Sequence, residues 1–178
     1  PNSGIAMTPS IKMWIFSGIV ELPASCNDWK LGITDCCRNA YHTNIENPEL
    51  TSIYTEVAVN NTKEQCSSPS FESLPDFYVY SGQGNRLNTR AVCKTADSVT
   101  ILPVTPMQTA VKPVKYLGAY SSIRPLRIDK GITIEENTGD YFLRPSQPET
   151  GVIAFTAVAW KGGEIAGSST REYRITAL

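Results

Sequence analysis

Short apolar runs separated by proline and glycine make up most of this chain, and they limit the folds open to it. Twelve prolines and twelve glycines are spread over 178 residues. They separate runs such as "SIYTEVAV", "SVTILPV" and "VIAFTAVAW", which are rich in β-branched and aromatic residues. This composition is typical of strands, and many short strands at near-even spacing indicate sandwiches rather than βαβ units. The sequence therefore predicts an all-β protein.

Composition and charge exclude several classes of protein. Hydrophobic residues make up 41% of the chain and charged residues 19%, which is too apolar for a disordered tail. The formal net charge is −1 and the sixteen Lys and Arg are dispersed, so we expect no nucleic-acid partner. The run "MWIFSGIVELP" is broken by Gly18 and Glu21 and is too short to span a bilayer. Because the chain begins at Pro1 without a signal-peptide pattern, we expect an excised piece or a mature product.

A stretch of small residues with two prolines, "CSSPSFESLPDF", predicts a domain boundary near Ser68 or Pro69. It divides the chain into residues 1–68 and residues 69–178. We expect two consecutive β-sandwich domains, the smaller of which is near the size at which disulfides become useful reinforcement. The end of the larger part predicts a final β-hairpin that turns at Gly162–Gly163.

The cysteines favour a disulfide framework. Cys26, Cys36, Cys37 and Cys66 fall in the first part, and Cys93 is alone in the second. In "DWKLGITDCCRN" the two-residue period of a strand places Cys37 on the apolar face and Cys36 on the opposite one, so the neighbours are expected to take different partners. We prefer Cys26 with Cys36 and Cys37 with Cys66, and the crossed alternative stays open. Cys93 is expected to be a free thiol.

Metal and catalytic readings of the same stretch fit less well. A zinc site needs four ligands, and the adjacent cysteines with the single histidine, His42, lack that spacing. A nucleophilic Cys36 or Cys37 lacks the helix N-terminus that would lower its pKa. Carboxylates lie on expected strand edges and turns, and there is no Walker loop, GxGxxG or GxSxG motif. We therefore expect no enzyme, and a small hydrolase is the third-ranked alternative.

Exposed aromatic side chains offer a second class of function. A carbohydrate-binding module would present tyrosines on one face of a sandwich, and this is the runner-up hypothesis. The candidate side chains are Tyr41, Tyr54, Tyr78, Tyr80, Tyr120, Tyr141 and Tyr173.

Several motifs together resemble a known family. The chain contains "GIVELPASCNDWKLGITDCCRNAYHTNI", then "SIYTEVAVNNT" and "CSSPSF". This pattern is similar to the amino-terminal region of the large gliding-motility surface adhesins of Bacteroidetes, the SprB type. Farther on, "IEENTGDYFLRPS" resembles the late hairpin of cadherin-like and Ig-like repeats. The resemblance implies an Ig-like sandwich for residues 1–68 and a cadherin-like or Ig-like sandwich for residues 69–178.

The resemblance also bears on cofactors and modification. Family members of this kind carry an acidic "DPDGDS" loop suited to calcium, which prefers oxygen ligands. Here the matching stretch is "CKTADS", with Cys93 and Thr95 in place of acids and only Asp97 remaining. We therefore expect no cofactor. The triplet from Asp97 to Val99 resembles the O-glycosylation acceptor of these bacteria, which implies a sugar on Ser98.

The resemblance implies a function in attachment. It predicts a non-enzymatic module of a large adhesin that is exported by the type IX route and carried at the cell surface by the gliding machinery. The implied partners are surface polysaccharide or another substratum, neighbouring domains of the same long chain, and gliding and secretion components. Many weak contacts acting in parallel would provide the adhesion.

Overall fold

The structure, a computed structural model, describes residues 5–8, 11–62, 67–135 and 138–178. These residues form fifteen strands and one 3-10 turn, η1 (Pro48–Leu50), without an α-helix, so the all-β prediction is confirmed. The strands are β1 (Ile5–Thr8), β2 (Ile11–Met13), β3 (Trp29–Asp35), β4 (Ile53–Val59), β5 (Ser70–Phe71), β6 (Tyr78–Val79), β7 (Asn85–Asn88), β8 (Ala91–Val92), β9 (Ser98–Val104), β10 (Met107–Thr109), β11 (Lys112–Pro113), β12 (Thr133–Glu135), β13 (Asp140–Leu143), β14 (Glu149–Lys161) and β15 (Glu164–Ala177).

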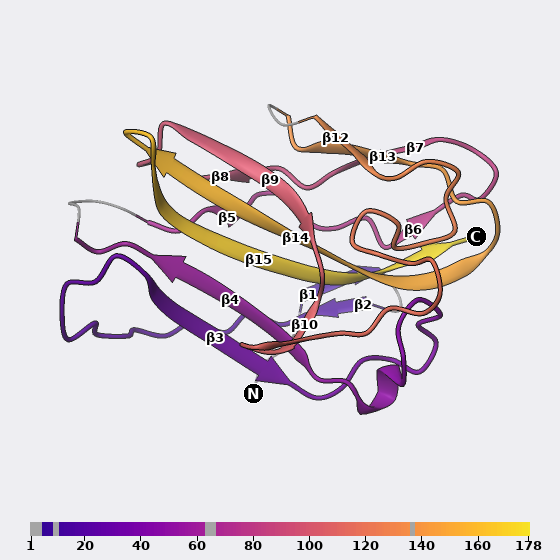
Figure 1. Cartoon of the computed structure of the whole chain (residues 1–178), viewed down its shortest axis with the longest axis horizontal. Helices are drawn as coiled ribbons and strands as arrows, with labels where there is room; N and C mark the ends of the chain where they lie inside the picture. Colours follow the sequence, from indigo (N-terminus) through magenta and orange to yellow (C-terminus); the bar gives the residue numbers. More distant parts are fainter. Residues whose placement is uncertain (1–4, 9–10, 63–66, 136–137) are drawn as a thin grey trace.

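A long hairpin organises the main sheet. Its strands β14 and β15 pair from Glu149 opposite Ala177 to Lys161 opposite Glu164. The chain reverses at Gly162–Gly163, whose φ angles of 58° and 80° are open to glycine without steric cost. The predicted final hairpin is therefore confirmed. The sheet contains eight strands, with β11, β10, β4, β15, β14 and β9 in order, β3 paired to β4 and β6 paired to β15 (Figure 1).

A smaller sheet covers one face of this hairpin. It has the order β12-β13-β7, and its inward side chains meet those of β14 and β15. Tyr141 and Phe155 are fully buried, with ring centroids 5.0 Å apart, and the Phe155 ring lies 6.3 Å from that of Tyr173. The two tyrosine hydroxyls form a hydrogen bond within the core. The molecule therefore contains a β-sandwich with an aromatic centre.

Strands from both sides of the expected domain boundary share the main sheet. β4 pairs with β15 through Val57–Val59 and Gly167–Ser169. A Cβ atom on Gly167 would lie 2.7 Å from the carbonyl oxygen of Ala58, so the glycine permits this close approach. The boundary at Ser68 therefore does not separate two sheets. The principal core, in contrast, draws all its buried members from the interval Val79 to Ala177.

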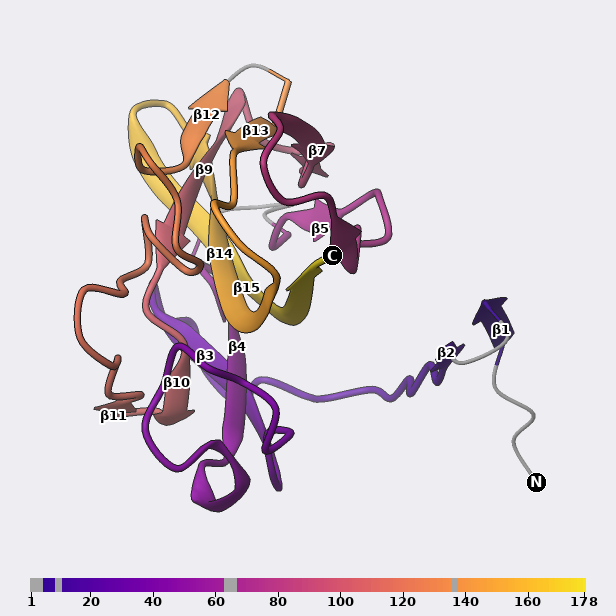
Figure 2. The same ribbon diagram turned by 90° about the vertical axis from the view of Figure 1, so that its right-hand side faces the viewer.

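The first strands of the chain lie apart from this body. β1 and β2 pair with each other in an antiparallel hairpin. Figure 2 shows this hairpin well away from the sandwich, joined to it by an extended segment that leads to β3. Large apolar side chains of that segment face solvent, among them Phe16 and Ile19, which are 83% and 97% exposed.

Candidate functional site

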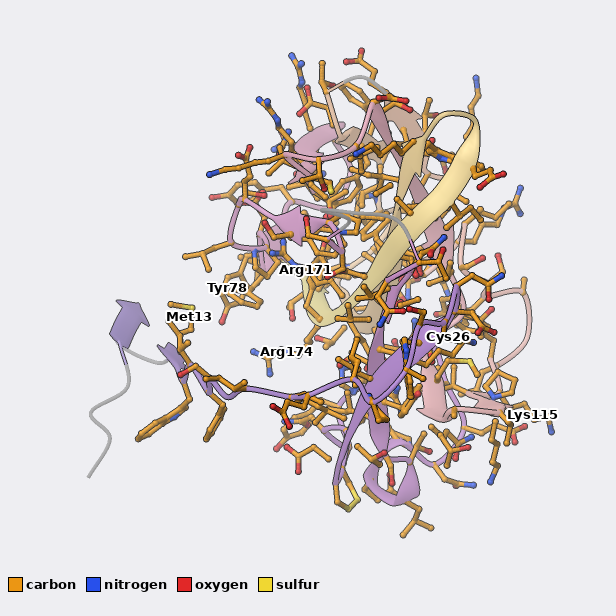
Figure 3. The ribbon with its side chains drawn as sticks, turned by 90° about the vertical axis from the view of Figure 1, so that its left-hand side faces the viewer. Met13, Cys26, Tyr78, Lys115, Arg171 and Arg174 are labelled. Carbon is orange, nitrogen blue, oxygen red and sulfur yellow. A yellow bond between two sulfur atoms is a disulfide. The ribbon has the colours of Figure 1, made fainter. Side chains whose placement is uncertain are left out.

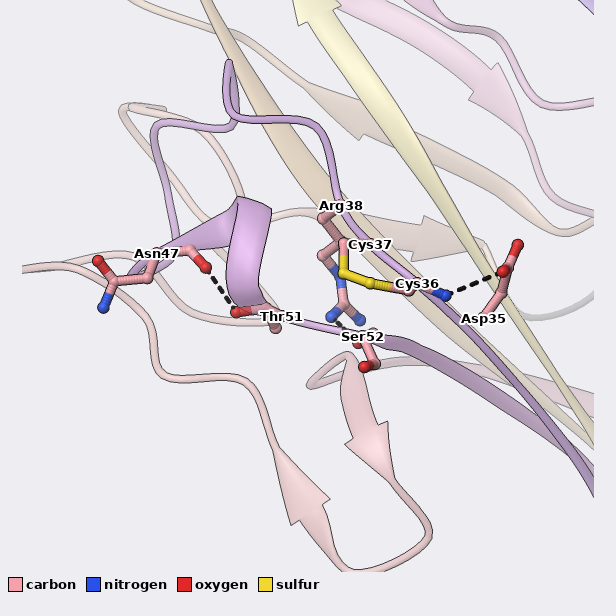
Figure 4. The surroundings of a disulfide bond; sticks show 7 residues. All are labelled: Asp35, Cys36, Cys37, Arg38, Asn47, Thr51 and Ser52. Carbon is pink, nitrogen blue, oxygen red and sulfur yellow. Dashed lines mark hydrogen bonds between the residues drawn. A yellow bond between two sulfur atoms is a disulfide. The ribbon is translucent and has the colours of Figure 1, made fainter.

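The cysteines of the "CCRN" motif lie just beyond the end of β3. Cys36 and Cys37 are bonded to each other, and the backbone N–H of Cys36 donates to the Asp35 carboxylate at 2.9 Å (Figure 4). Cys26 precedes the opposite end of β3, and its thiol donates to Asp28 at 3.0 Å. The seven extended residues of β3 span about 20 Å, whereas bridged Cα atoms lie within about 7 Å. The expected Cys26–Cys36 pairing is therefore incompatible with this strand. Cys66 lies outside the described residues.

The next residue of the motif, Arg38, has a structural position. Its guanidinium forms two hydrogen bonds with Glu172 on β15, from Nε at 2.7 Å and from Nη2 at 2.6 Å. Nη2 also donates to the Met107 carbonyl at 2.9 Å, and Nη1 donates to the carbonyl of Ser52. The side chains of the pair are 1% and 5% exposed. Arg38 thus connects the starts of β4 and β10 with β15 inside the protein.

His42 lies close to this ion pair and is also buried. Its Nδ1 is 2.8 Å from the Asn39 carbonyl oxygen, so Nδ1 carries the proton in the neutral ring. Burial lowers the pKa of His42, against the hydrogen bond to Asn39, and the positive charges of Arg38 and Arg174 lower it further. Nε2 is buried without a hydrogen-bond partner among the described residues. The geometry is that of a neutral, packed imidazole.

The stretch "CKTADS" (residues 93–98), which matches the calcium loop of the family that the sequence resembles, contacts the long hairpin. The Asp97 carboxylate accepts a hydrogen bond from the backbone N–H of Gly162 at 2.7 Å, and the Asp97 N–H donates to the Trp160 carbonyl at 2.8 Å. Within the described ranges, no group of three or more His, Cys, Asp and Glu is placed to hold a metal ion. Ser98, the expected glycosylation site, is exposed as the first residue of β9.

The candidate tyrosines fall into different environments. Tyr141 and Tyr173 belong to the core, and the Tyr54 ring lies over Gly32 of β3. Tyr78 and Tyr80 are exposed, as is Tyr41 in a separate loop. Figure 3 shows Tyr78 on the flank toward which the segment with Met13 extends. The remaining candidate, Tyr120, lines a pocket.

This pocket, of about 710 Å³, is the strongest candidate ligand site. Its walls come from three separate parts of the chain, namely Thr43, the loop 117–129 and residues 146–149. Leu117, Leu126 and Pro148 give it apolar surface. A pocket that combines apolar walls with a few fixed polar groups is the usual form of a small-ligand site.

Three polar side chains of the pocket hold one another in place. The Tyr120 hydroxyl donates to Oε2 of Glu149 at 2.6 Å, and Nε of Arg127 donates to the Tyr120 oxygen at 3.2 Å. The backbone N–H of Arg127 donates to Oε1 of Glu149. Burial raises the pKa of Tyr120, as does its hydrogen bond to Glu149, so the phenol remains protonated. The site therefore offers a hydroxyl, a carboxylate and a guanidinium in fixed positions.

Asn44 positions this pocket loop against β14. Its Nδ2 donates to the carbonyls of Pro125 and Val152, and its Oδ1 accepts from the Val152 N–H, each at 2.9 to 3.0 Å. Its own carbonyl accepts from the Leu117 N–H at 3.0 Å. Asn44, Arg127 and Glu149 carry no local sequence signal for a site, because they come from distant parts of the chain. Of the pocket residues, only Tyr120 was predicted as a candidate from the sequence.

Comparison of the chain with models of protein families, with curated proteins and with solved structures gives no match. Among the described residues there is also no helix with the length and hydropathy needed to cross a membrane.

Proposed function

We propose that this chain is a non-enzymatic module of a large bacterial cell-surface adhesin used in gliding motility and attachment. The resemblance of the "CCRN" region and of the later hairpin to such adhesins supports this function, and the all-β sandwich is compatible with the Ig-like and cadherin-like modules that the resemblance implies. In this proposal the full protein leaves the cell by the type IX route. Neighbouring domains of the same chain, together with the gliding machinery, display the module at the surface.

The pocket formed by Tyr120, Arg127 and Glu149 is the structural observation that best supports a role in adhesion. Sugar rings present hydroxyl groups around an apolar face, and fixed carboxylate, guanidinium and phenol groups can donate to and accept from those hydroxyls. The apolar wall can contact the ring face. A surface polysaccharide is therefore the proposed ligand. Each single contact would be weak, and many modules acting together would give firm attachment.

Binding to immobilised polysaccharides and to a glycan array tests this function. We expect Tyr120→Phe and Arg127→Gln to weaken binding by about tenfold or more, because each removes a hydrogen bond that involves a charged partner. Lys112→Gln, on the exposed strand β11, is the matched control and should leave binding unchanged. Recovery of the bound glycan intact by mass spectrometry supports a binding role, and recovery of cleaved glycan would contradict it. Equal binding by both pocket variants and the control would exclude the pocket.

A carbohydrate-binding module that uses exposed aromatics is the second candidate. The specific observation in its favour is the pair Tyr78 and Tyr80, which are 46% and 61% exposed and only two residues apart. Alanine substitution of both separates the two candidates. Loss of glycan binding in this double variant, with normal binding by Arg127→Gln, would place the sugar on the tyrosines rather than in the pocket.

The proposed O-glycan on Ser98 has its own test. Ser98 is exposed at the start of β9, where an attached sugar meets solvent. Protein purified from the producing bacterium should show a mass above that of the polypeptide, and Ser98→Ala should remove the increment. An unmodified Ser98 peptide from that source would contradict the assignment.

A further inference from the structure

The outer edge of β3 is an unpaired strand edge. β3 pairs with β4 along its whole length, from Trp29 opposite Val59 to Asp35 opposite Ile53, and no described strand pairs with its other side. Since backbone groups of a strand point alternately to its two sides, about half of those of β3 face outward without a strand partner. Its side chains Leu31 and Ile33 are also exposed, Ile33 to 72%. Such an edge can accept another strand.

The chain also carries an apolar segment that has no place in its own fold. Residues 14–20 have the sequence Trp-Ile-Phe-Ser-Gly-Ile-Val, and their five large apolar side chains are at least half exposed. Residues 14–23 make no hydrogen bond to the rest of the described chain. β-Branched and aromatic residues favour the extended conformation. The segment is therefore a potential strand that needs a partner to cover its apolar surface.

Hydrogen bonds hold the connection between this segment and β3 against the residues that follow β4. The Cys26 N–H donates to Oδ1 of Asn61 at 2.6 Å, and the Asn61 N–H donates to the Cys26 carbonyl at 3.0 Å. The Ala24 carbonyl accepts from Nδ2 of Asn61 at 2.9 Å and from Nε1 of Trp29 at 3.1 Å. Residues 24–26 are thus held beside Asn61, just past the end of β4, and the chain bends at Asn27 before β3 begins. The preceding segment leads away from the sandwich toward β2 (Figure 2).

We propose that the segment Trp14–Ile19 of one copy of this chain pairs as an antiparallel strand with the outer edge of β3 in a second copy. One register makes the two strands complementary. With Phe16 opposite Leu31, Trp14 faces Ile33, and these aromatic and aliphatic pairs lie on one face of the extended sheet. In the same register Gly18 faces Trp29, and Ile15 faces Gly32, over which the Tyr54 ring lies. Gly18 therefore leaves room for the Trp29 ring, and Ile15 would pack beside the Tyr54 ring that covers Gly32.

Reciprocal exchange gives the apolar segment and the β3 edge of both copies a partner. Each chain has one donor segment and one acceptor edge, so two copies related by a two-fold axis leave neither unpaired. Exchange of an identical element is a low-cost route to a dimer because the contacts are encoded in one sequence. A second copy is the proposed occupant because the segment leads away from the sandwich of its own chain (Figure 2).

The mass of the 178-residue chain in solution, measured by light scattering over a range of concentrations, tests the association. We expect twice the chain mass, and we expect Phe16→Asp and Ile33→Lys each to raise the dissociation constant by about tenfold or more, because each places a charge on the apolar face of the new pairing. Val111→Lys is the matched control, since Val111 is 88% exposed in the turn after β10. A chain that stays monomeric, or variants that associate like the control, would overturn the proposal.

Cross-linking distinguishes exchange between copies from a hairpin within one copy. A Phe16→Cys chain is mixed with an isotopically labelled Leu31→Cys chain, and the linked peptides are identified after oxidation. A disulfide between a labelled and an unlabelled peptide at positions 16 and 31 supports the exchange. In the double variant Phe16→Cys/Leu31→Cys, a link found only within single chains would show that the segment closes on its own β3, and would overturn the proposal.

Discussion

Arg38 and Glu172, 134 positions apart in the sequence, form a buried ion pair through two hydrogen bonds of 2.6 and 2.7 Å. The same guanidinium also donates to the carbonyls of Ser52 and Met107, so few of its N–H groups lack a hydrogen-bond partner. Burial raises the pKa of Glu172, and the hydrogen bonds and charge of Arg38 oppose that shift. The arginine of the "CCRN" motif is therefore a connection between strands that are remote in the chain.

Removal of one partner of this pair should destabilise the protein strongly. We expect Arg38→Leu to lower the free energy of unfolding by about 3–5 kcal/mol, because it leaves the Glu172 carboxylate buried without a counter-charge. Arg90→Leu is the matched control, since Arg90 forms an exposed ion pair with Glu72 and should cost less than about 1 kcal/mol. Urea unfolding followed by circular dichroism measures both. Similar losses for the two variants would show that burial of the Arg38 pair is not the source of stability.

His42 should make stability fall in mild acid. The pKa of His42 in the folded protein is below the ordinary value of 6.5, mainly through burial. In mild acid the unfolded chain therefore binds a proton at this residue more readily than the folded protein does. The resulting contribution is complete above pH 6.5 and is lost as the pH falls below that value toward the folded pKa. Unfolding free energies of the wild type and of His42→Gln, compared across this interval, give the difference due to His42. A wild-type profile that parallels the variant would contradict this assignment.

Gly151 should not tolerate a methyl group. A Cβ atom there would lie 2.6 Å from the Pro125 carbonyl oxygen and 3.0 Å from Nδ2 of Asn44, at the base of the pocket loop. We expect Gly151→Ala to cost about 1–3 kcal/mol by overpacking and to weaken glycan binding, because Asn44 positions the loop. Gly84→Ala is the control, since a Cβ on Gly84 meets no atom within 4 Å. Thermal unfolding and the glycan assay give the two readouts, and equal melting temperatures for both variants would exclude the clash.

Peptide mapping without reduction decides the cysteine pairing. The structure predicts a free thiol on Cys26, which lies at the far end of β3 from Cys36. The Cys93 thiol donates to the carbonyl of Ser67 at 3.1 Å. We expect Cys93, like Cys26, as a free thiol. Detection of a Cys26–Cys36 link would require that β3 is not extended as described.

Local patterns were sufficient for the fold class and for the last hairpin. Alternation and β-branched composition act within a few residues, and Gly162–Gly163 permit a tight turn at the place where two apolar runs meet. The boundary at Ser68 was inferred from composition alone. Pairing of β4 with β15 depends on contacts across more than 100 positions, which no local pattern encodes.

The candidate site was harder to predict for the same reason. Its carboxylate, guanidinium and phenol belong to the start of β14 and to a loop more than 20 positions earlier, and only the fold brings them together. The tyrosines show that alternation along the sequence does not by itself predict which side chains are buried. Tyr141 and Tyr173 alternate with other residues as Tyr78 and Tyr80 do, yet the first two are core and the last two are exposed.

The sequence by itself determined that this chain forms strands, where its final hairpin turns, and that its composition is that of a folded protein. Those properties follow from the backbone preferences and burial tendencies of neighbouring residues. Only the tertiary structure decided which strands pair, that Arg38 meets Glu172, that Cys26 lies at the far end of β3 from Cys36, and that Tyr120 joins Arg127 and Glu149 in a pocket. These relationships depend on the packing of distant segments, because burial and hydrogen bonding are satisfied by the whole fold and not by any single stretch of it.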